Sequence, residues 1–380
     1  MALAIDGGKP AVSGLLRPYN SIGDSEIAAA LAAINSGPLS GFLGGERHGG
    51  YYVQSLEEEM CYVFGSKHAV ACNSATSGLL IASLACGVGR DTRVSVPAFT
   101  MSATAAAPAF LGADLVFCDV EDKTFNVNTI PFCKVAIATN LFGHPAELES
   151  IRKFGKYMLI EDNAQGWFAK ENGRYAGTIG HIGVFSFNVH KHLQSGEGGI
   201  CLTDDPELAD NMRLYRNHGE LAGLSGVGLN LRMTEVDAAI ALAQLERGRE
   251  LVASRVELAE KMTHMVVNYP GLVPPLVREG CDHSYYMWAL TVEKDRDWFV
   301  RAMNAEGVPL NRGYVSPLYN LPAFERYKSS CPVAEWLHRY ALATFEICAY
   351  DPTAEQLREM QDAFDKVGEE YARRGRESAA

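Results

Sequence analysis

The chain has 380 residues, of which 47% are hydrophobic and 21% charged, and its formal net charge is −12. This length allows two domains with sizeable cores, and the composition is ordinary for a soluble globular protein. The acidic balance argues against nucleic acid or an anionic membrane as a partner, because both select basic surfaces. No run of the sequence approaches the ~20 apolar residues that a membrane span requires.

The nine cysteines form no C-x-x-C pair. Several of them, such as Cys72, Cys118 and Cys201, lie in or beside apolar runs and are expected to be small buried hydrophobic residues. Residues 1–9 show no basic segment followed by an apolar core, so no signal peptide is predicted. We therefore expect a reducing, cytoplasmic compartment.

Helices and short apolar strands alternate through the first 200 residues. Residues 1–22 are expected to wrap the surface, and a glycine-rich loop over 37–50 follows the first helix. Helical periodicity and apolar runs predict the remaining elements. Helices are expected at 24–35, 52–64 and 75–86, and strands at 68–72, 93–97, 115–120, 135–140, 157–162, 182–187 and 200–203.

The second half of the chain is predicted to end in a smaller α/β domain. We expect a large domain over 1–250 and a small C-terminal domain over 251–380. The predicted elements of this half are helices at 206–215, 236–262 and 297–306, a glycine-rich loop at 219–228 and a strand at 283–292.

The stretch 184–199 is the most informative part of the sequence. An apolar strand breaks there into a polar loop that holds Lys191 between His190 and His192 and closes on Gly196-Glu197-Gly198-Gly199. Lysine is a nucleophile only when deprotonated, and desolvation or nearby cations lower its pKa. Taken alone, Lys191 would be interpreted as a solvated surface residue, as most lysines are.

An upstream strand changes that interpretation. It ends in Glu161-Asp162-Asn163-Ala164-Gln165, and the carboxyl ends of strands are where open α/β sheets bind ligands. Ser186 follows Asp162 by 24 residues, and Lys191 comes five residues later. A pyridoxal phosphate (PLP) site uses this spacing, because a carboxylate pairs with the pyridinium nitrogen and a lysine carries the Schiff base.

These motifs resemble those of the DegT/StrS-type aminotransferases, members of the fold-type-I PLP superfamily that aminate keto-sugars and related cyclitols. The shared motifs are E-D-N-A-Q at 161–165, F-S-F at 185–187 followed by Lys191, and G-E-G-G at 196–199. The resemblance covers nearly the whole chain. It implies an α/β fold in which a mostly parallel seven-stranded sheet, flanked by helices, forms the large domain beside the smaller C-terminal α/β domain.

The resemblance also implies roles for individual residues. Lys191 would form the Schiff base and Asp162 would pair with the pyridinium nitrogen. Gln165 would bind the phenolic oxygen of PLP, and the loop 37–50 would approach the substrate unless it is only a connector. The PLP phosphate would be held by Ala75, Thr76 and Ser186, and weaker substrate contacts are expected from Arg312 and Tyr314. A helix start of small residues such as 73–79 favours phosphate, although alone it is usually just a cap.

Two positions leave alternatives open. In the family pattern P-x-x-T-aromatic-x-x-T, at 97–104, the aromatic position that stacks on the cofactor is Met101. A thioether can pack on a π face, and Phe99 is the alternative. Asn230, in G-x-N-x-R-M-x-E at 228–235, would reach the cofactor phosphate of a neighbouring subunit and so implies a homodimer with shared sites. A helix-capping turn would also explain Asn230.

Four histidines outside this pattern are harder to interpret. His144 follows a strand end and would either transfer protons or, more commonly, cap its turn. His181 stands where the family usually has aspartate. His190 and His192 flank Lys191 and are expected to pack within the loop.

The implied activity is ping-pong transfer of an amino group from L-glutamate, or L-glutamine, to a keto-sugar, expected to be nucleotide-linked. A PLP-dependent sugar dehydratase shares this fold but carries histidine at the Schiff-base position, which Lys191 argues against. The intact set of Lys191, Asp162, Gln165 and Ser186 argues against a non-catalytic PLP-binding protein. A metal hydrolase is disfavoured because the ten histidines form no H-x-x-x-H pair.

Overall fold

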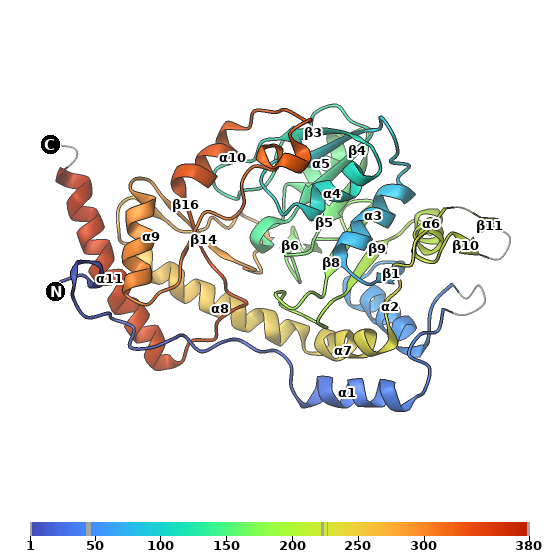
Figure 1. Ribbon diagram of the computed structural model, residues 1–380, viewed down its shortest axis with the longest axis horizontal. Helices are drawn as coiled ribbons and strands as arrows, with labels where there is room; N and C mark the ends of the chain where they lie inside the picture. Colours follow the sequence, from blue (N-terminus) through green and yellow to red (C-terminus); the bar gives the residue numbers. More distant parts are fainter. Residues whose placement is uncertain (1, 43–46, 222–223, 226, 378–380) are drawn as a thin grey trace.

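The computed structural model describes residues 2–42, 47–221, 224–225 and 227–377. Parts of the predicted loops at 37–50 and 219–228 therefore lie outside the described residues. Figure 1 shows a large sheet with helices on both sides and a second group of helices and strands formed mainly by the C-terminal part of the chain, from α8 onward. The described elements are helices α1 (Asp24–Asn35), α2 (Tyr51–Phe64), α3 (Ala75–Ala85), α4 (Ala103–Phe110), α5 (Leu148–Phe154), α6 (Pro206–Arg216), α7 (Glu235–Glu246), α8 (Gly248–Val266), α9 (Arg296–Ala305), α10 (Pro332–Trp336) and α11 (Ala354–Glu377), and the strands named below.

The large sheet has seven strands in the order β1-β9-β8-β5-β4-β2-β3. Strands β2 to β8 of this sheet pair in parallel, whereas β9 is antiparallel to both β1 and β8. The predicted mostly parallel seven-stranded sheet is thereby confirmed. Its strands are β1 (His68–Cys72), β2 (Arg93–Pro97), β3 (Asp114–Cys118), β4 (Val135–Thr139), β5 (Met158–Asp162), β8 (Ile182–Ser186) and β9 (Gly199–Thr203).

Side chains alternate between the two faces of this sheet, as the period of a β-strand requires. Val184 and Cys201 pack into a core with α3, α4 and α6 on one face. Phe185 and Ile200, their neighbours in the chain, pack with α2 and α7 on the other face. Both faces are buried, which explains why these strands read as continuous apolar runs.

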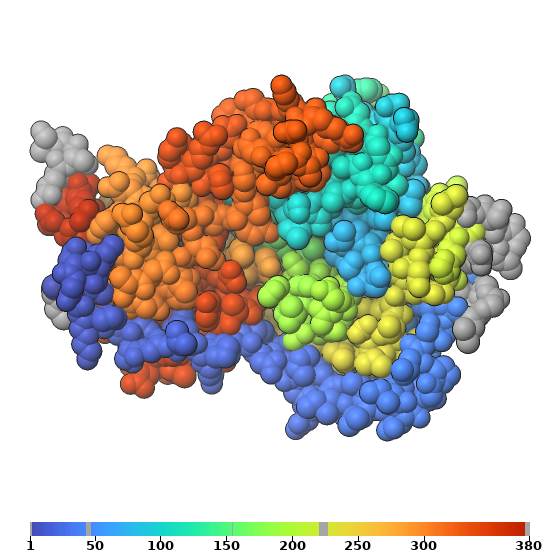
Figure 2. Space-filling model, in the orientation of Figure 1, coloured from blue at the N-terminus to red at the C-terminus, as the bar shows by residue number. Residues whose placement is uncertain are grey.

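The C-terminal part is built on an antiparallel four-stranded sheet in the order β12-β14-β16-β15. Its core includes apolar residues of α8, α9 and α11, and also Leu3, Val12 and Leu16 from the start of the chain. Figure 2 shows this N-terminal segment running along the edge of the molecule toward α1. The strands are β12 (Leu272–Val273), β14 (Trp288–Val292), β15 (Asn311–Arg312) and β16 (Leu342–Phe345).

Helix α8 joins the two parts, because Leu251 packs in the core of the large sheet and Leu258 in the C-terminal core. We predict that the large and small domains divide near its start, at residue 250. Among the described residues, no helix combines the length and apolar character needed to cross a membrane.

Two predicted elements differ from the structure. The single helix expected at 236–262 is two helices, α7 and α8, which meet at Arg247 (φ −96°, ψ 1°). Gly248 allows the turn to pack closely, since a Cβ there would lie 2.7 Å from the ring of Phe168. The strand expected at 283–292 begins only at Trp288, because the preceding residues bond to the turn at 141–143 instead.

Candidate active site

The carboxyl ends of the parallel strands bring the predicted residues to one edge of the large sheet. Asp162 ends β5 and Ser186 ends β8, and these two strands are adjacent and parallel. Lys191 lies in the loop after β8, where its N–H donates to the carbonyl of Asn188 at 2.8 Å. The loop closes when Val189 N–H donates to Gly196 O at 3.0 Å. This edge is where open α/β sheets bind ligands.

Lys191 is a half-buried lysine with an altered acidity. Its Nζ lies 4.3 Å from the centre of the Tyr286 ring. Burial lowers the pKa of Lys191 to about 8, although the nearby Asp162 carboxylate opposes this shift. The neutral amine, the form that acts as a nucleophile or base, is therefore populated at a mildly alkaline pH.

Asp162 is a buried carboxyl group held by two donors. Its side chain is 5% exposed. Thr104 Oγ1 donates to Oδ2 at 2.6 Å, and Ala164 N–H donates to Oδ1 at 3.3 Å. Burial raises the pKa of Asp162, whereas the Thr104 hydrogen bond and the Lys191 ammonium lower it.

Thr104 is a site residue whose role sequence reasoning missed, although it ends the motif at 97–104. Its hydroxyl lies 3.0 Å from that of Thr100, which lies 3.2 Å from that of Thr139. This buried chain of hydroxyls leads from the end of β4 to Asp162. The repeated threonines were the signal that could have revealed it.

Gln165 and Tyr314 form a second hydrogen-bonded group. Gln165 Oε1 accepts from Phe142 N–H at 2.7 Å, and its Nε2 donates to Tyr314 Oη at 3.0 Å. The ring of Tyr314 also packs edge-on against Phe99 and Phe142. Burial raises the pKa of Tyr314 to about 12, so its hydroxyl stays neutral. The structure thus brings Tyr314 from the C-terminal part to the strand-end residues.

Arg312 has a different setting. It lies on β15 with a side chain that is 59% exposed, and its Nη1 is 3.6 Å from an Asp297 carboxylate oxygen. Within the described part of the chain, no hydrogen bond or ion pair joins Arg312 to Lys191 or Asp162.

The start of α3 lies beside the end of β8, and we call these two segments together the cradle. Ser74 caps the helix, and its Oγ accepts from Ser77 N–H at 3.1 Å. Ala75 and Thr76 occupy the first helical positions, whose N–H groups have no acceptor within the helix. Ser186 is in register with Gly199, where a Cβ would lie only 2.5 Å from Ala75 N. Gly199 therefore lets the serine and the helix N-terminus approach one another.

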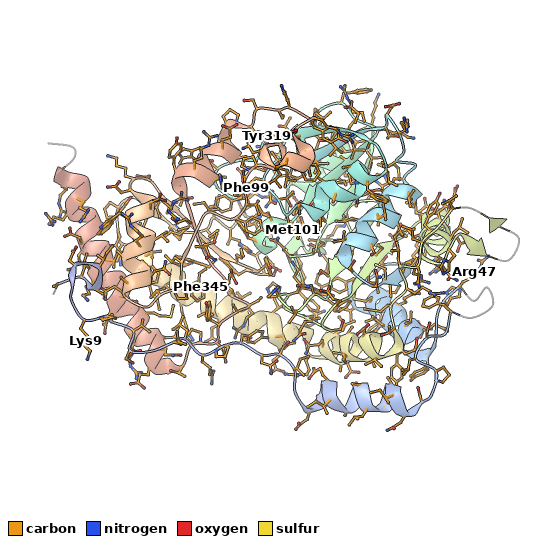
Figure 3. All side chains as sticks on the ribbon, in the orientation of Figure 1. Lys9, Arg47, Phe99, Met101, Tyr319 and Phe345 are labelled. Carbon is orange, nitrogen blue, oxygen red and sulfur yellow. The ribbon has the colours of Figure 1, made fainter. Side chains whose placement is uncertain are left out.

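The structure distinguishes Met101 from Phe99. Phe99 is fully buried and has no free ring face, whereas Met101 is 51% exposed. Figure 3 shows both residues between the large sheet and the C-terminal part. An open side chain can pack on a ligand and a fully enclosed one cannot, so this contrast favours Met101.

Asn230 lies on the surface next to the cradle. Its Oδ1 accepts from Arg232 Nε at 2.9 Å, and the following residue, Leu231, accepts from Asn73 N–H at 3.0 Å. The same strand-like segment pairs with Asn217.

The histidines serve mainly to hold turns together. His144 is buried; its Nδ1 donates to Pro145 O at 2.8 Å and its Nε2 accepts from Arg278 N–H at 3.1 Å, which supports the turn interpretation. His181 Nδ1 accepts from Leu159 N–H at 2.9 Å. His192 is buried and donates from Nε2 to Ser284 O at 2.8 Å, whereas His190 is exposed.

Together, the sheet order, the lysine after β8, the aspartate ending β5 and the helix N-terminus beside Ser186 define a fold-type-I PLP enzyme. The chemistry of these residues fits the cofactor: a carboxyl group would face its pyridine nitrogen, a lysine amine its aldehyde, and a helix N-terminus with a serine hydroxyl its phosphate. The family model of the DegT/DnrJ/EryC1/StrS aminotransferase family matches residues 24–345. The chain therefore belongs to this family, and it is a PLP-dependent aminotransferase.

Similar proteins agree with this assignment. The UDP-N-acetyl-3-dehydro-alpha-D-glucosamine 3-aminotransferase of Acidithiobacillus ferrooxidans is 32% identical over 324 residues, covering 82% of this chain and 85% of that protein. An aminotransferase structure from Psychrobacter cryohalolentis has 26% identity and a TM-score of 0.85, covering 94% of this chain and 99% of the other. DesI, solved in the presence of its TDP-sugar product, has 26% identity and a TM-score of 0.84, covering 99% and 98%.

Proposed function

We propose that this aminotransferase moves an amino group from L-glutamate, or alternatively L-glutamine, to a keto-sugar linked to a nucleotide. The observation that carries the proposal is the pair of Lys191 and Asp162 at one sheet edge, close enough for each charge to shift the pKa of the other. The nucleotide link is supported by the similarity to a UDP-sugar aminotransferase and to a structure solved with a TDP-sugar.

The proposed roles follow from the chemistry of each side chain. When bound, PLP supplies an electron sink that stabilises negative charge at the reacting carbon. Asp162 would hold a proton on the pyridine nitrogen, and Lys191 would bind the cofactor covalently and, as a free amine, move protons as acid and base. Phosphate would be bound by Ala75, Thr76 and Ser186.

Gln165 and Met101 would orient the cofactor ring. Gln165 Nε2 has a second hydrogen besides the one given to Tyr314 and could donate it to the phenolic oxygen. Met101 would pack on the ring face with its exposed thioether. Tyr314 would meet the substrate from the C-terminal side, with Arg312 as a more distant contact.

We also propose that the protein acts as a homodimer in which Asn230 reaches the partner's cofactor phosphate. An exposed apolar stripe on α1 supports association, because Ile27, Leu31 and Ile34 are 53%, 54% and 52% exposed at helical spacing. For location we propose the cytoplasm, which suits the nine free cysteines.

The test is spectroscopic. Purified protein is mixed with PLP, then with L-glutamate or L-glutamine, and finally with UDP- or TDP-linked keto-sugars. We expect a visible band that L-glutamate bleaches and a keto-sugar restores, and Lys191→Ala should not form it. If the band forms but no amino donor bleaches it, the proposed transamination is wrong, and a PLP-dependent dehydratase or a non-catalytic PLP-binding protein becomes the better interpretation. If PLP does not bind, the assignment of Lys191 and Asp162 fails.

A further inference from the structure

The amine of Lys191 lies over the aromatic ring of Tyr286. Nζ lies 4.3 Å from the ring centre, well within the ~6 Å at which a cation is attracted to a π face. Burial raises the pKa of Tyr286, so the ring faces the lysine as a neutral phenol. Tyr286 is half-buried and packs against the core of the large sheet, although it belongs to the C-terminal part.

The backbone fixes Tyr286 in this position. Tyr286 N–H donates to Phe142 O at 2.7 Å, and Ser284 N–H donates to Gly143 O at 3.0 Å. Ser284 O in turn accepts from His192, the residue after Lys191, at 2.8 Å. One short segment is therefore tied both to the strand-end turn and to the lysine loop.

Two bulky residues adopt the left-handed conformation, one in this segment and one in the turn 141–143 to which the segment is hydrogen-bonded. Phe142 has φ 58° and Tyr285 has φ 52°. Bulky residues rarely adopt this conformation, which persists only where surrounding contacts hold it. The left-handed backbone of Tyr285 places its own ring against the ring of His283, with 3.8 Å between the ring centres. It also places the ring of the next residue, Tyr286, over the amine of Lys191.

We propose that Tyr286 is a positioning residue for Lys191: its ring face holds the ammonium whenever that side chain is not bonded to the cofactor. The contact restricts the long, flexible side chain of Lys191 to a position over the Tyr286 ring. It also favours the charged form of the amine, against the burial that disfavours it. This inference rests on the proposed role of Lys191.

Three other titratable side chains influence Lys191: one at the end of β5, one after β16 and one in the lysine loop itself. The carboxylate of Asp162, at the end of β5, raises the pKa of Lys191 and so favours the ammonium. Cys348 follows β16, and burial raises the pKa of its thiol to about 12, so it is neutral. His192, beside Lys191 in the loop, is also neutral at physiological pH because burial lowers its pKa to about 4. Among the described residues, the Asp162 carboxylate and the Tyr286 ring therefore stabilise this charge.

The test measures the pKa of Lys191 in full-length protein freed of cofactor, by trace acetylation with acetic anhydride across pH and peptide mapping. Exposed Lys9, at the far end of the molecule (Figure 3), is the internal reference for reagent activity. Tyr286→Leu should lower the Lys191 pKa by about half a unit or more, since a cation–π contact is lost. Tyr286→Phe, which keeps the ring, should leave it at the wild-type value.

Tyr285→Leu is the matched control, because it removes the adjacent ring that stacks on His283 and not on Lys191. It should not shift the Lys191 pKa. If Tyr286→Leu does not fold, Tyr286→Met, which preserves more volume, should give the same lowering. An unchanged pKa in the ring-removing variants, or a rise caused by water entering, would overturn the proposal. Because no turnover is measured, this outcome is independent of whether the enzyme transfers amines.

Discussion

Thr104 donates its hydroxyl proton to Asp162 Oδ2 at 2.6 Å, inside the protein and beneath the proposed cofactor site. The carboxylate has few other donors, and burial favours its neutral form. Thr104 is thus the main polar group that favours the ionised form of Asp162, which is the form that would pair with a protonated pyridine nitrogen.

Replacing Thr104 by valine keeps the shape and removes this donor. A hydrogen bond to a charged group contributes ~1.5–3 kcal/mol, so the rate of the half-reaction with L-glutamate should fall by about tenfold or more. Thr104→Ser, which retains the hydroxyl, should keep most of the activity. The measurement is the single-turnover rate with L-glutamate, and equal rates for the valine variant and the wild type would contradict this role.

Buried neutral histidines make stability depend on pH. Burial lowers the pKa of both His144 and His192 to about 4 from an ordinary value of 6.5. Between these values the unfolded chain binds protons that the folded protein does not, so stability present above pH 6.5 is lost as pH falls toward 4. The loss should reach roughly 3 kcal/mol for each histidine.

Thermal melts from pH 7 to pH 4 test this prediction. His192→Gln can still donate to Ser284 O but does not titrate, so its Tm should fall less steeply with acid than that of the wild type. His190→Gln, at the exposed neighbouring position, should follow the wild-type curve. Parallel curves for all three proteins would contradict the assignment.

A buried ion pair holds the helix α2 to the edge of the large sheet. Arg216 is fully buried, and its Nη1 lies 2.7 Å from Glu57 Oε1, which also accepts from Ala71 N–H at 2.8 Å. Glu57→Leu leaves the guanidinium uncompensated and should cost about 3–5 kcal/mol of unfolding free energy. Glu58→Leu, exposed on the same helix, should change it little. Urea unfolding of the two variants tests this prediction. Similar unfolding midpoints for both would show that the Arg216–Glu57 ion pair does not contribute to stability.

The apolar stripe on α1 predicts how the proposed dimer associates. Leu31→Asp places a charge in the centre of the stripe and should shift the protein toward monomers, which multi-angle light scattering would detect. Ala32→Asp places the same charge at an exposed position on another side of this helix and should leave the dimer intact. A Leu31→Asp protein that stays dimeric at low concentration would exclude this face as the interface.

Much of the fold follows from local patterns in the sequence. The helix predicted at 24–35 matches α1, and the strand predicted at 68–72 matches β1. Periodicity did not reveal the break at Arg247, because one glycine in an amphipathic run is tolerated by a helix. It is the packing of Gly248 on Phe168, a tertiary contact, that favours the turn.

Sequence motifs allowed us to predict only some of the residues of the candidate site. Lys191, Asp162 and Ser186 lie at strand ends whose spacing the sequence displays. Tyr286 was predicted to lie in a strand. Its orientation depends on the left-handed backbone of Tyr285, which no local sequence pattern predicts. The proposed role of Asn230 depends on a second subunit, so one chain cannot reveal its contacts.

The central claim is that Lys191 carries PLP. Reducing the PLP-treated protein with sodium borohydride fixes the cofactor to the amine that holds it, and peptide mapping then identifies that residue. We predict one phosphopyridoxyl group for each chain, on Lys191, and none in Lys191→Ala. A label on another lysine, or equal labelling of the Lys191→Ala protein, would contradict the account.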